Sequence, residues 1–375
     1  MNKSFKKIIA GLFILGILGS AAWVIFTREQ IIKIEENPTK FHEAMYYKKF
    51  FGNNIVQCNL CPNLCVLSPG QYGLCKARKN IQGKLYSLVY GQIATSHVDP
   101  IEKKPFFHVL PGRAAFSIAT TGCNIQCLFC QNWEISQIFP FEMQTAAATP
   151  QQVVRQALSS GTQAIAFTYS EPTISFEYVL DIAKLAKAAG LKTLMVSNGY
   201  IEQKPLREIL KYIDAYKVDF KGFDESFYQK MTRGHLQPVL ETMKTIHQSG
   251  VWLEIVTLLI TNQNDSDDQI RGLARWIHHN LGDNVPLHFS RFFPKYKLLN
   301  VPPTPPETLI RAREIAMQEG LKYVYTGNID YPPGEITHCP SSGEKIIVRQ
   351  GMFTIYNGLK GGTCADGEKI PGVWN

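Results

Sequence analysis

The residues best suited to chemistry are three cysteines within the segment TTGCNIQCLFCQNWEISQ, residues 120–137. Cys123, Cys127 and Cys130 have the spacing C-x3-C-x2-C, with no fourth thiol nearby. Thiolates on a loop of this length can bind three irons of a cubane cluster, whereas iron–sulfur clusters ordinarily have a cysteine on every iron. The spacing therefore predicts an iron–sulfur site with one iron open to a reacting ligand. The alternative is a zinc knuckle completed by a distant His or Cys.

A second group of cysteines precedes the main domain. Cys58, Cys61, Cys65 and Cys75 have the spacing C-x2-C-x3-C-x9-C. Four thiolates saturate either a structural zinc ion or an auxiliary four-cysteine iron–sulfur cluster. The spacing leaves both metals open, and an exported protein could instead pair these thiols as disulfides. In either metal case we expect the site to hold structure or relay electrons rather than bind substrate.

From residue 111 onward, short β-branched or aromatic runs alternate with helical segments. Thr149 and Pro150 mark the start of one helix, and Gly161 marks its end. Six strand–helix units with apolar strands predict a parallel α/β sheet, either open and doubly wound or a partial barrel. The predicted strands are residues 115–119, 164–168, 191–196, 215–220, 252–259 and 287–289, and the predicted helices are residues 151–159, 174–189, 204–212, 239–248, 267–278 and 306–318.

Polar residues follow most of these strands. Sites in parallel α/β sheets gather at the carboxyl ends of the strands, so we expect these side chains to share one mouth with the three cysteines. They are Tyr169, Ser170 and Glu171 after the second strand, Ser197 and Asn198 after the third, Asp219 and Lys221 after the fourth, and His288, Ser290 and Arg291 at the sixth.

The three cysteines, with Phe129 directly before the last, resemble the cysteine motif of the radical S-adenosylmethionine (radical SAM) superfamily. The strings HVDPIEKKPFFHVLPG, YSEPT and HFSRFFPKY resemble the AmmeMemoRadiSam-system radical SAM enzymes, relatives of the pyruvate formate-lyase activating enzymes, over residues 42–375. The resemblance implies a partial (β/α)6 TIM-like barrel and a [4Fe–4S] cluster whose open iron is chelated by SAM. Reductive cleavage of SAM then gives a 5′-deoxyadenosyl radical, which abstracts hydrogen from a substrate.

The resemblance also implies which residues contact SAM. Ser170 and Glu171 stand where the superfamily has its GGE motif, which binds the SAM amino group; here Tyr169 and Ser170 replace the glycines. Carboxylates suit the SAM ammonium, cations suit its carboxylate, and small polar groups suit its ribose. The implied SAM contacts are Phe129, Ser170, Glu171, Ser197, Asn198, Lys217, Asp219, His288 and Arg291.

The N-terminus predicts a membrane segment. Residues 8–26 contain Ser20 as the only polar side chain and, as a helix, would span about 28 Å, close to a bilayer core. A cleaved signal peptide is the alternative. We expect a single-pass protein with its barrel on the cytoplasmic face, where SAM and low-potential electrons are available. The predicted segments are an anchor (1–27), a linker (28–57), a Cys-rich extension (58–110), the barrel (111–325) and an irregular tail (326–375).

The tail departs from the related enzymes, which often end in paired C-x2-C knuckles. Cys339 and Cys364 each keep only the first thiol of such a pair, so we expect no metal there.

The formal charge of +8 is modest, and the chain has no Lys/Arg block, so we expect no nucleic-acid partner. The resemblance implies an enzyme with a protein substrate and a reductant protein as partners. A small-molecule substrate or a different protein side chain is the alternative within this class. From another class, the chain could be a non-catalytic metal-binding membrane protein with a degenerate SAM site.

Overall fold

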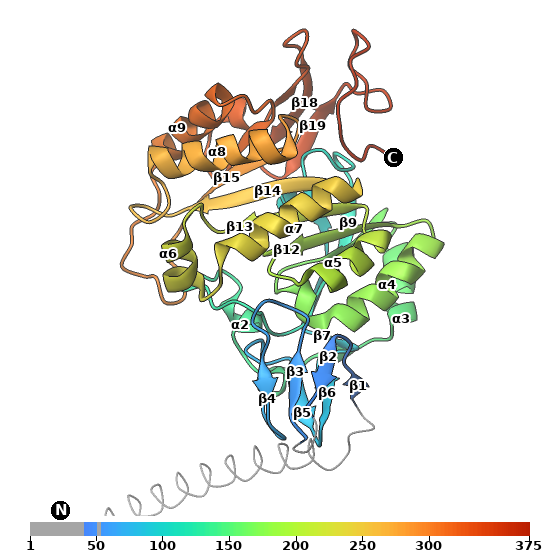
Figure 1. Ribbon diagram of the computed structural model, residues 1–375. Coiled ribbons are helices and arrows are strands. Elements are labelled where there is room, and N and C mark those ends of the chain that lie inside the picture. The colour runs from blue at the N-terminus through green and yellow to red at the C-terminus, as the bar shows by residue number, and fades with distance from the viewer. Residues whose placement is uncertain (1–40, 51–53) are drawn as a thin grey trace, which may run out of the picture.

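The structure is a computed structural model that describes residues 41–50 and 54–375. Its centre is an eight-stranded sheet with the order β16-β15-β14-β13-β12-β11-β9-β8 (Figure 1). All neighbouring strands from β9 to β16 pair in parallel, and β8 joins the β9 edge antiparallel. The strands of this sheet are β8 (Thr95–Pro100), β9 (Ala114–Ala119), β11 (Ala164–Phe167), β12 (Lys192–Ser197), β13 (Ala215–Phe220), β14 (Trp252–Leu259), β15 (Leu287–Arg291) and β16 (Val324–Gly327).

Helices follow the parallel strands, and Figure 1 shows α4, α5, α7 and α8 on one side of the sheet. The main helices are α3 (Pro150–Ser159), α4 (Phe176–Ala188), α5 (Gln203–Ile209), α7 (Leu236–Ser249), α8 (Asp267–Leu281) and α9 (Pro306–Gln318). Short turns of helix are α2 (Trp133–Ser136), α6 (Glu225–Phe227), η2 (Ile101–Lys103), η3 (Pro140–Glu142), η4 (Pro172–Ser175), η5 (Leu210–Tyr212), η7 (Pro332–Gly334) and the π-helix η6 (Tyr228–Thr232).

The start of α3 shows how local sequence sets these elements. The Thr149 hydroxyl accepts a hydrogen bond from the Gln152 backbone N–H at 3.2 Å, and the Gln152 side chain accepts one from the Thr149 N–H at 2.7 Å. This reciprocal cap satisfies two N–H groups that a helix start leaves unpaired. Strand β11 is buried along its whole length, as a parallel strand covered on both faces requires.

The predicted α/β class is confirmed, and the mostly parallel sheet is consistent with a radical SAM partial barrel. Two details differ from the prediction. The parallel part contains one strand more than the six that were predicted, namely β16. This strand was missed because the apolar run after α9 is short and no predicted helix follows it. The tail predicted to be irregular contains a three-stranded sheet of β17 (Thr337–His338), β18 (Lys345–Gln350) and β19 (Phe353–Asn357).

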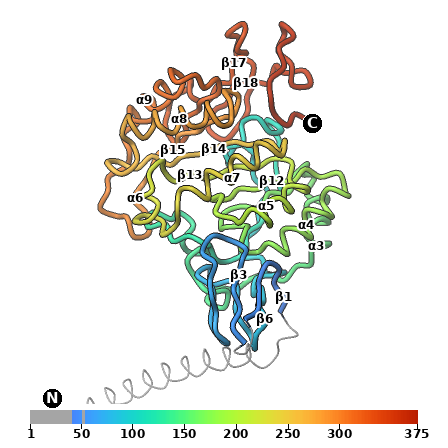
Figure 2. The backbone as a smooth tube through the Cα atoms, in the orientation of Figure 1, coloured from blue at the N-terminus to red at the C-terminus, as the bar shows by residue number. Residues whose placement is uncertain are grey.

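The amino ends of the strands are closed by the chain around His108 and by the C-terminus. The Leu110 N–H donates to the Val373 carbonyl at 2.8 Å, and His108 Nδ1 lies 2.8 Å from the Pro371 carbonyl oxygen. Burial lowers the pKa of His108 to about 4, so the ring is neutral and its Nδ1–H can donate to that carbonyl. Figure 2 shows the C-terminus at this end of the molecule, away from the N-terminal strands.

The N-terminal extension lies at the opposite end and forms two small sheets, β1-β6-β5 and β2-β3-β4. Its strands are β1 (His42–Glu43), β2 (Tyr47–Lys49), β3 (Val56–Cys58), β4 (Val66–Leu67), β5 (Arg78–Ile81) and β6 (Lys84–Ser87), and a further pair joins β7 (Gln92–Ile93) to β10 (Ala146–Ala147). Residues 28–57 were predicted to be a linker, but the described part of that range already carries β1, β2 and the start of β3.

A buried ion pair joins this extension to the main domain. The Arg78 guanidinium lies 2.7 and 2.8 Å from the two carboxylate oxygens of Glu177 on α4, and both side chains are almost fully buried. The Met45 N–H donates to the same carboxylate at 2.6 Å. Removing one partner of such a pair costs about 3–5 kcal/mol, because the other charge stays buried and unpaired. The extension is therefore held firmly against α4.

The membrane prediction needs correction. Among residues 41–50 and 54–375, no helix is both long and apolar enough to cross a bilayer. This finding overturns the expected single-pass protein with its barrel at the cytoplasmic face. The predicted span at residues 8–26 itself lies outside the described residues.

Candidate cluster and cofactor site

The three cysteines of the C-x3-C-x2-C motif lie on the loop between β9 and α2. Backbone hydrogen bonds fix this loop: Gln126 N–H donates to the Thr232 carbonyl at 2.7 Å and Leu128 N–H to the Met231 carbonyl at 2.9 Å. Both acceptors belong to η6, so the loop lies against the segment that follows β13 and α6. Cys127 is buried, and Cys123 and Cys130 are half-buried.

Gly122 sets where Cys123 lies. Its φ is +105°, in the region that L side chains rarely adopt, and a Cβ added there would lie 2.5 Å from the Cys75 carbonyl oxygen. Only glycine allows the loop backbone to approach Cys75 this closely. The first cysteine of the loop is therefore placed by contact with the last cysteine of the N-terminal group.

The surroundings of the three thiols favour a metal-bound state. Burial raises the pKa of all three, and it brings that of Cys127 to about 12. The Lys221 ammonium opposes this effect at Cys127 and Cys130. Metals bind the thiolate, so bound irons supply the positive charge that three buried thiolates lack.

The spacing of the thiols argues against a single ion. Within the described residues, one trio of metal-ligating side chains has donor atoms all within 4.8 Å of one another, and it is Cys339, Cys364 and Asp366 in the tail. The Cys123, Cys127 and Cys130 sulfurs therefore do not all lie within 4.8 Å of one another, whereas bonds of about 2.3 Å put the sulfurs of a zinc site roughly 3.8 Å apart. A cluster of several irons fits this spacing. In the tail, Cys339 and Cys364 form a disulfide, whereas the other seven cysteines are free.

Glu171 lies beside Cys123 at the end of β11. Its carboxylate accepts hydrogen bonds from Thr173 N–H at 2.9 Å, Ser197 Oγ at 2.7 Å and Asn198 N–H at 2.8 Å. Burial raises the pKa of Glu171, and these donors oppose that shift. The Asn198 side-chain amide lies 3.7 Å from the Cys123 sulfur and donates to Asn124 Oδ1 at 2.8 Å. The ends of β11 and β12 thus converge on Cys123.

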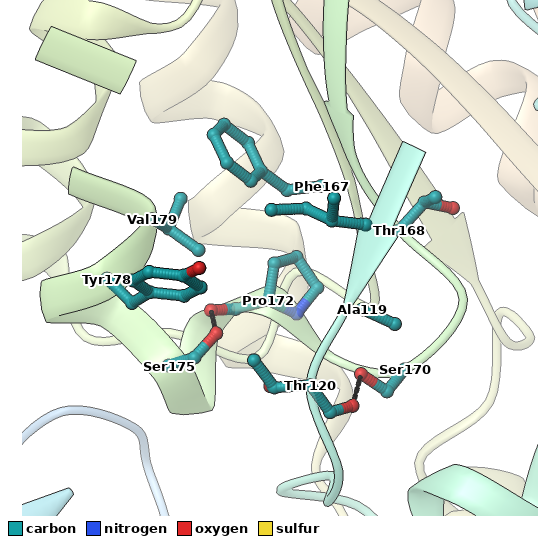
Figure 3. Close-up of a pocket in the computed structure, with 10 residues that line it drawn as sticks. Ala119, Thr120, Phe167, Thr168, Ser170, Pro172, Ser175, Tyr178 and Val179 are labelled. Atoms are coloured by element: carbon teal, nitrogen blue, oxygen red, sulfur yellow. Dashed lines mark hydrogen bonds between the residues drawn. The ribbon is translucent and has the colours of Figure 1, made fainter. Parts of the chain in front are cut away.

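Of Tyr169 and Ser170, the two residues predicted to replace glycines of the superfamily motif, Tyr169 keeps a glycine-like backbone. Tyr169 has a φ of +67°, in the left-handed region, and its carbonyl accepts a hydrogen bond from Asn132 Nδ2 at 2.7 Å. Its hydroxyl is hydrogen-bonded to Asp99. The Ser170 hydroxyl turns back to the Thr120 carbonyl at 2.6 Å, at the edge of a small, mainly apolar pocket between β9, β11 and α4 (Figure 3). Ser170 therefore shapes the loop rather than pointing at the thiols.

Two lysines surround Asp219 at the end of β13. Lys217 forms an ion pair with Asp219, and Lys221 Nζ lies 3.7 Å from its other oxygen. Burial alone would raise the pKa of Asp219, but the two ammonium groups hold it below its usual value. Burial works against the Lys221 charge, yet Asp219 and all three thiols raise its pKa. Lys221 was predicted to lie at the mouth shared with the cysteines, but it was not among the implied SAM contacts. Its position two residues after Asp219 was the feature of the sequence that pointed to this site.

Three of the implied SAM contacts have their partners elsewhere. His288 is the second residue of β15 and pairs with Val256 of β14. Its Nε2 is 2.7 Å from the buried Glu254 carboxylate, which also accepts the Phe107 and His108 N–H groups. Arg291 Nε donates to the Thr304 carbonyl at 2.7 Å. Phe129 is buried and packs near Phe227. The structure thus gathers Glu171, Ser197, Asn198 and Asp219 near the thiols. Lys217 instead lies within β13, paired with Asp219, and His288 belongs to the closed end of the sheet.

Comparison with known proteins agrees with this geometry. The family model of the radical SAM superfamily matches residues 117–277. An uncharacterized protein of Methanocaldococcus jannaschii, MJ0808, is 44% identical over 307 residues, which cover 82% of this chain and 91% of that protein. The chain belongs to the radical SAM superfamily. The prediction that it is an enzyme is confirmed: it is a radical SAM enzyme, and membership implies a [4Fe–4S] cluster and SAM.

More distant relatives include pyruvate formate-lyase 1-activating enzyme of Escherichia coli, which is 22% identical over 221 residues, or 54% of this chain and 89% of that enzyme. Among solved structures, a radical SAM methyltransferase from Sphaerobacter thermophilus has a TM-score of 0.46 at 15% identity over 58% of this chain and 68% of that chain. A pyruvate-formate lyase-activating enzyme domain from Bacteroides vulgatus has a TM-score of 0.39 at 16% identity, over 44% and 99%. Placement in the AmmeMemoRadiSam-system subgroup stays a prediction.

The Gly122 contact predicts that Gly122→Ala will lose cluster iron. The added Cβ strains the backbone at positive φ and displaces Cys123 from Cys75. Gly161→Ala is the matched control, because its φ is +69° but nothing lies within 4 Å of the added Cβ. Iron per chain after anaerobic purification should fall clearly below the wild-type level in Gly122→Ala and stay at the wild-type level in Gly161→Ala. Equal iron in the two variants would contradict the contact's role.

Proposed function

We propose that Cys123, Cys127 and Cys130 bind the [4Fe–4S] cluster of this radical SAM enzyme and that SAM binds at the iron they leave open. When bound, the cluster and SAM together supply a 5′-deoxyadenosyl radical. The observation that carries the proposal is the position of the buried Glu171 carboxylate beside Cys123. Asn198 contacts both residues, since its backbone N–H donates to Glu171 and its side-chain amide lies beside the Cys123 sulfur. A carboxylate at this place can accept the SAM ammonium next to the open iron.

The chain's own residues then have distinct roles. Thr173, Ser197 and Asn198 hold the Glu171 carboxylate in one orientation through their three hydrogen bonds. Lys221 lies among the thiols and offsets their negative charge, and Asp219 fixes its ammonium group. Glu171 and Cys127 are buried, and their burial limits the access of water to the site.

The remaining predicted SAM contacts divide into two sets. Asp219 keeps about a third of its side-chain surface exposed (34%), so it can still accept a ribose hydroxyl while paired with Lys217. Arg291 is partly exposed at the end of β15 and can turn toward the SAM carboxylate. We assign His288 and Phe129 supporting roles instead, because His288 is engaged by Glu254 and Phe129 by the core.

We propose that the substrate is a protein. The distant relation to an activating enzyme whose name gives a protein target, pyruvate formate-lyase, supports this choice. The sheet supports it too, since its end strands β8 and β16 do not pair with each other and leave the barrel open along one side. An open side can admit a loop of polypeptide, whereas a closed barrel restricts entry to its mouth. A one-electron reductant protein is the second proposed partner.

The first prediction from this proposal concerns SAM cleavage. Anaerobically loaded and reduced protein should convert SAM to 5′-deoxyadenosine and methionine, and Cys127→Ala should abolish the product because one iron loses its thiolate. The double variant Cys339→Ala/Cys364→Ala is the matched control, since it removes the two disulfide-bonded cysteines of the tail, distant from the site in sequence, and should cleave SAM at the wild-type rate. Chromatography of the products measures both. A fully loaded, reduced wild type that forms no 5′-deoxyadenosine would refute the proposed chemistry.

The second prediction concerns the substrate class. A perdeuterated lysate is separated by size into a macromolecular and a small-molecule fraction, and each is added to the reduced enzyme with unlabelled SAM. Hydrogen abstraction from a protein should place deuterium in 5′-deoxyadenosine only with the macromolecular fraction, and protease treatment should remove the effect. Mass spectrometry detects the label. Deuterium transfer from the small-molecule fraction alone would show that the substrate is not a protein.

A further inference from the structure

The four cysteines of the N-terminal extension surround one cavity. Cys58, Cys61, Cys65 and Cys75 line it together with Arg78 and Ile174, among other residues, and all four are free thiols. Cys58, Cys65 and Cys75 all act electrostatically on Cys61, which agrees with the place of the four side chains around this cavity. Four thiols that face one cavity, with no disulfide among them, form a ligand set for metal.

The distances between the sulfurs discriminate between a single ion and a cluster. Three thiolates on one zinc ion lie roughly 3.8 Å apart, given bonds of about 2.3 Å in a tetrahedron. In the part of the chain that the structure describes, no three of these four sulfurs lie within 4.8 Å of one another, since the trio that does is in the tail. The Cys123, Cys127 and Cys130 sulfurs likewise do not all lie within 4.8 Å of one another. Neither cysteine group in the described residues therefore has the close spacing of a zinc-bound set.

We propose that Cys58, Cys61, Cys65 and Cys75 bind a second iron–sulfur cluster of the [4Fe–4S] type, rather than zinc, and that it passes single electrons to the site at Cys123, Cys127 and Cys130. The binding of the second cluster stands by itself. The electron transfer rests on the proposed function, because it needs a cluster at the first site.

Two contacts join the second cysteine group to the first on both sides of Cys123. On one side, Gly122 approaches the Cys75 carbonyl so closely that a Cβ would lie 2.5 Å from it. On the other side, Asn63 Nδ2 donates to the Asn124 carbonyl at 2.6 Å. Asn63 lies between Cys61 and Cys65, so ligand-bearing segments of the second site touch both neighbours of Cys123. These contacts give a short, packed route between the sites.

The second site also has an outer and an inner side. Cys58 and Cys75 are buried, whereas Cys61 and Cys65 are half-buried and the adjacent Leu64 is exposed. The exposed edge can receive electrons from another protein, and the buried edge contacts the loop of Cys123. On the inner side, the buried Arg78 guanidinium, which is ion-paired with Glu177, also interacts electrostatically with Cys58 and Cys75.

The proposed transfer balances as two one-electron steps. A low-potential carrier protein, with a reduced flavin or an iron–sulfur centre, loses one electron, and the second cluster changes from the 2+ to the 1+ state. The second cluster then returns to 2+ as the first cluster gains that electron. No bond forms or breaks, and no proton moves in either step.

Metal analysis tests the cluster without reference to SAM cleavage. The variant Cys123→Ala/Cys127→Ala/Cys130→Ala removes the first site, and the protein is purified anaerobically from cells supplied with both iron and zinc. We expect about four irons per chain, little zinc, and Mössbauer parameters of a [4Fe–4S] cluster. One zinc with no iron would overturn the proposal, and so would a folded protein without either metal. If the variant does not fold, the wild type decides: about eight irons support the second cluster, and about four irons with one zinc refute it.

Electron paramagnetic resonance tests the proximity of the two sites. When both clusters are reduced, their spins should interact, so the wild-type spectrum should differ from the sum of two single-site spectra. The single-site proteins are the triple variant above and Cys61→Ala/Cys65→Ala, which removes the second site. A wild-type spectrum equal to that sum would overturn the electron transfer. Failure of the proposed SAM chemistry is a separate result, because it shows as missing 5′-deoxyadenosine while both resonance signals remain.

Discussion

Negative charge gathered in a buried place is the constraint on which the functional end of this protein depends. Three thiolates and the Glu171 carboxylate converge where β9, β11 and β12 end, and burial disfavours the ionised form of each of these groups. Part of this negative charge is offset by the ammonium group of Lys221 and by hydrogen bonds that the Ser197 hydroxyl and the Asn198 N–H donate to Glu171. In the proposed function, bound irons and the SAM ammonium supply the remaining positive charge.

The rest of the fold keeps these strand ends in place. At the closed end, Glu254 accepts hydrogen bonds from the Phe107 and His108 backbones and from His288, so strands β14 and β15 are joined to the chain that enters β9. At the functional end, the buried Arg78–Glu177 pair fixes the N-terminal extension against α4. The extension in turn packs Cys75 on Gly122. A buried carboxylate thus anchors each end of the sheet, one through backbone amides and one through a guanidinium.

The sequence predicted the fold class and the motif cysteines because both depend on local patterns. Strand–helix alternation needs only periodicity, and Glu171, Ser197 and Asn198 follow strands directly, where parallel sheets gather their polar groups. His288 was assigned to the cofactor because its distance from the carboxyl end of the strand is not visible in the sequence; it lies near the amino end of β15, beside Glu254. The glycine-like backbone of Tyr169 and the contact between Gly122 and Cys75 depend on tertiary packing. Periodicity carries no information about either.

The central claim is that the open iron at Cys123, Cys127 and Cys130 is completed by SAM. Electron–nuclear double resonance on the reduced protein tests it directly, with SAM that carries ¹⁵N in its amino group. A SAM nitrogen bound to iron should give a ¹⁵N hyperfine coupling that is absent with unlabelled SAM. The triple variant that lacks these cysteines should show no such coupling, even if its second cluster is reduced. A fully reduced wild type with saturating labelled SAM and no ¹⁵N coupling would contradict the account.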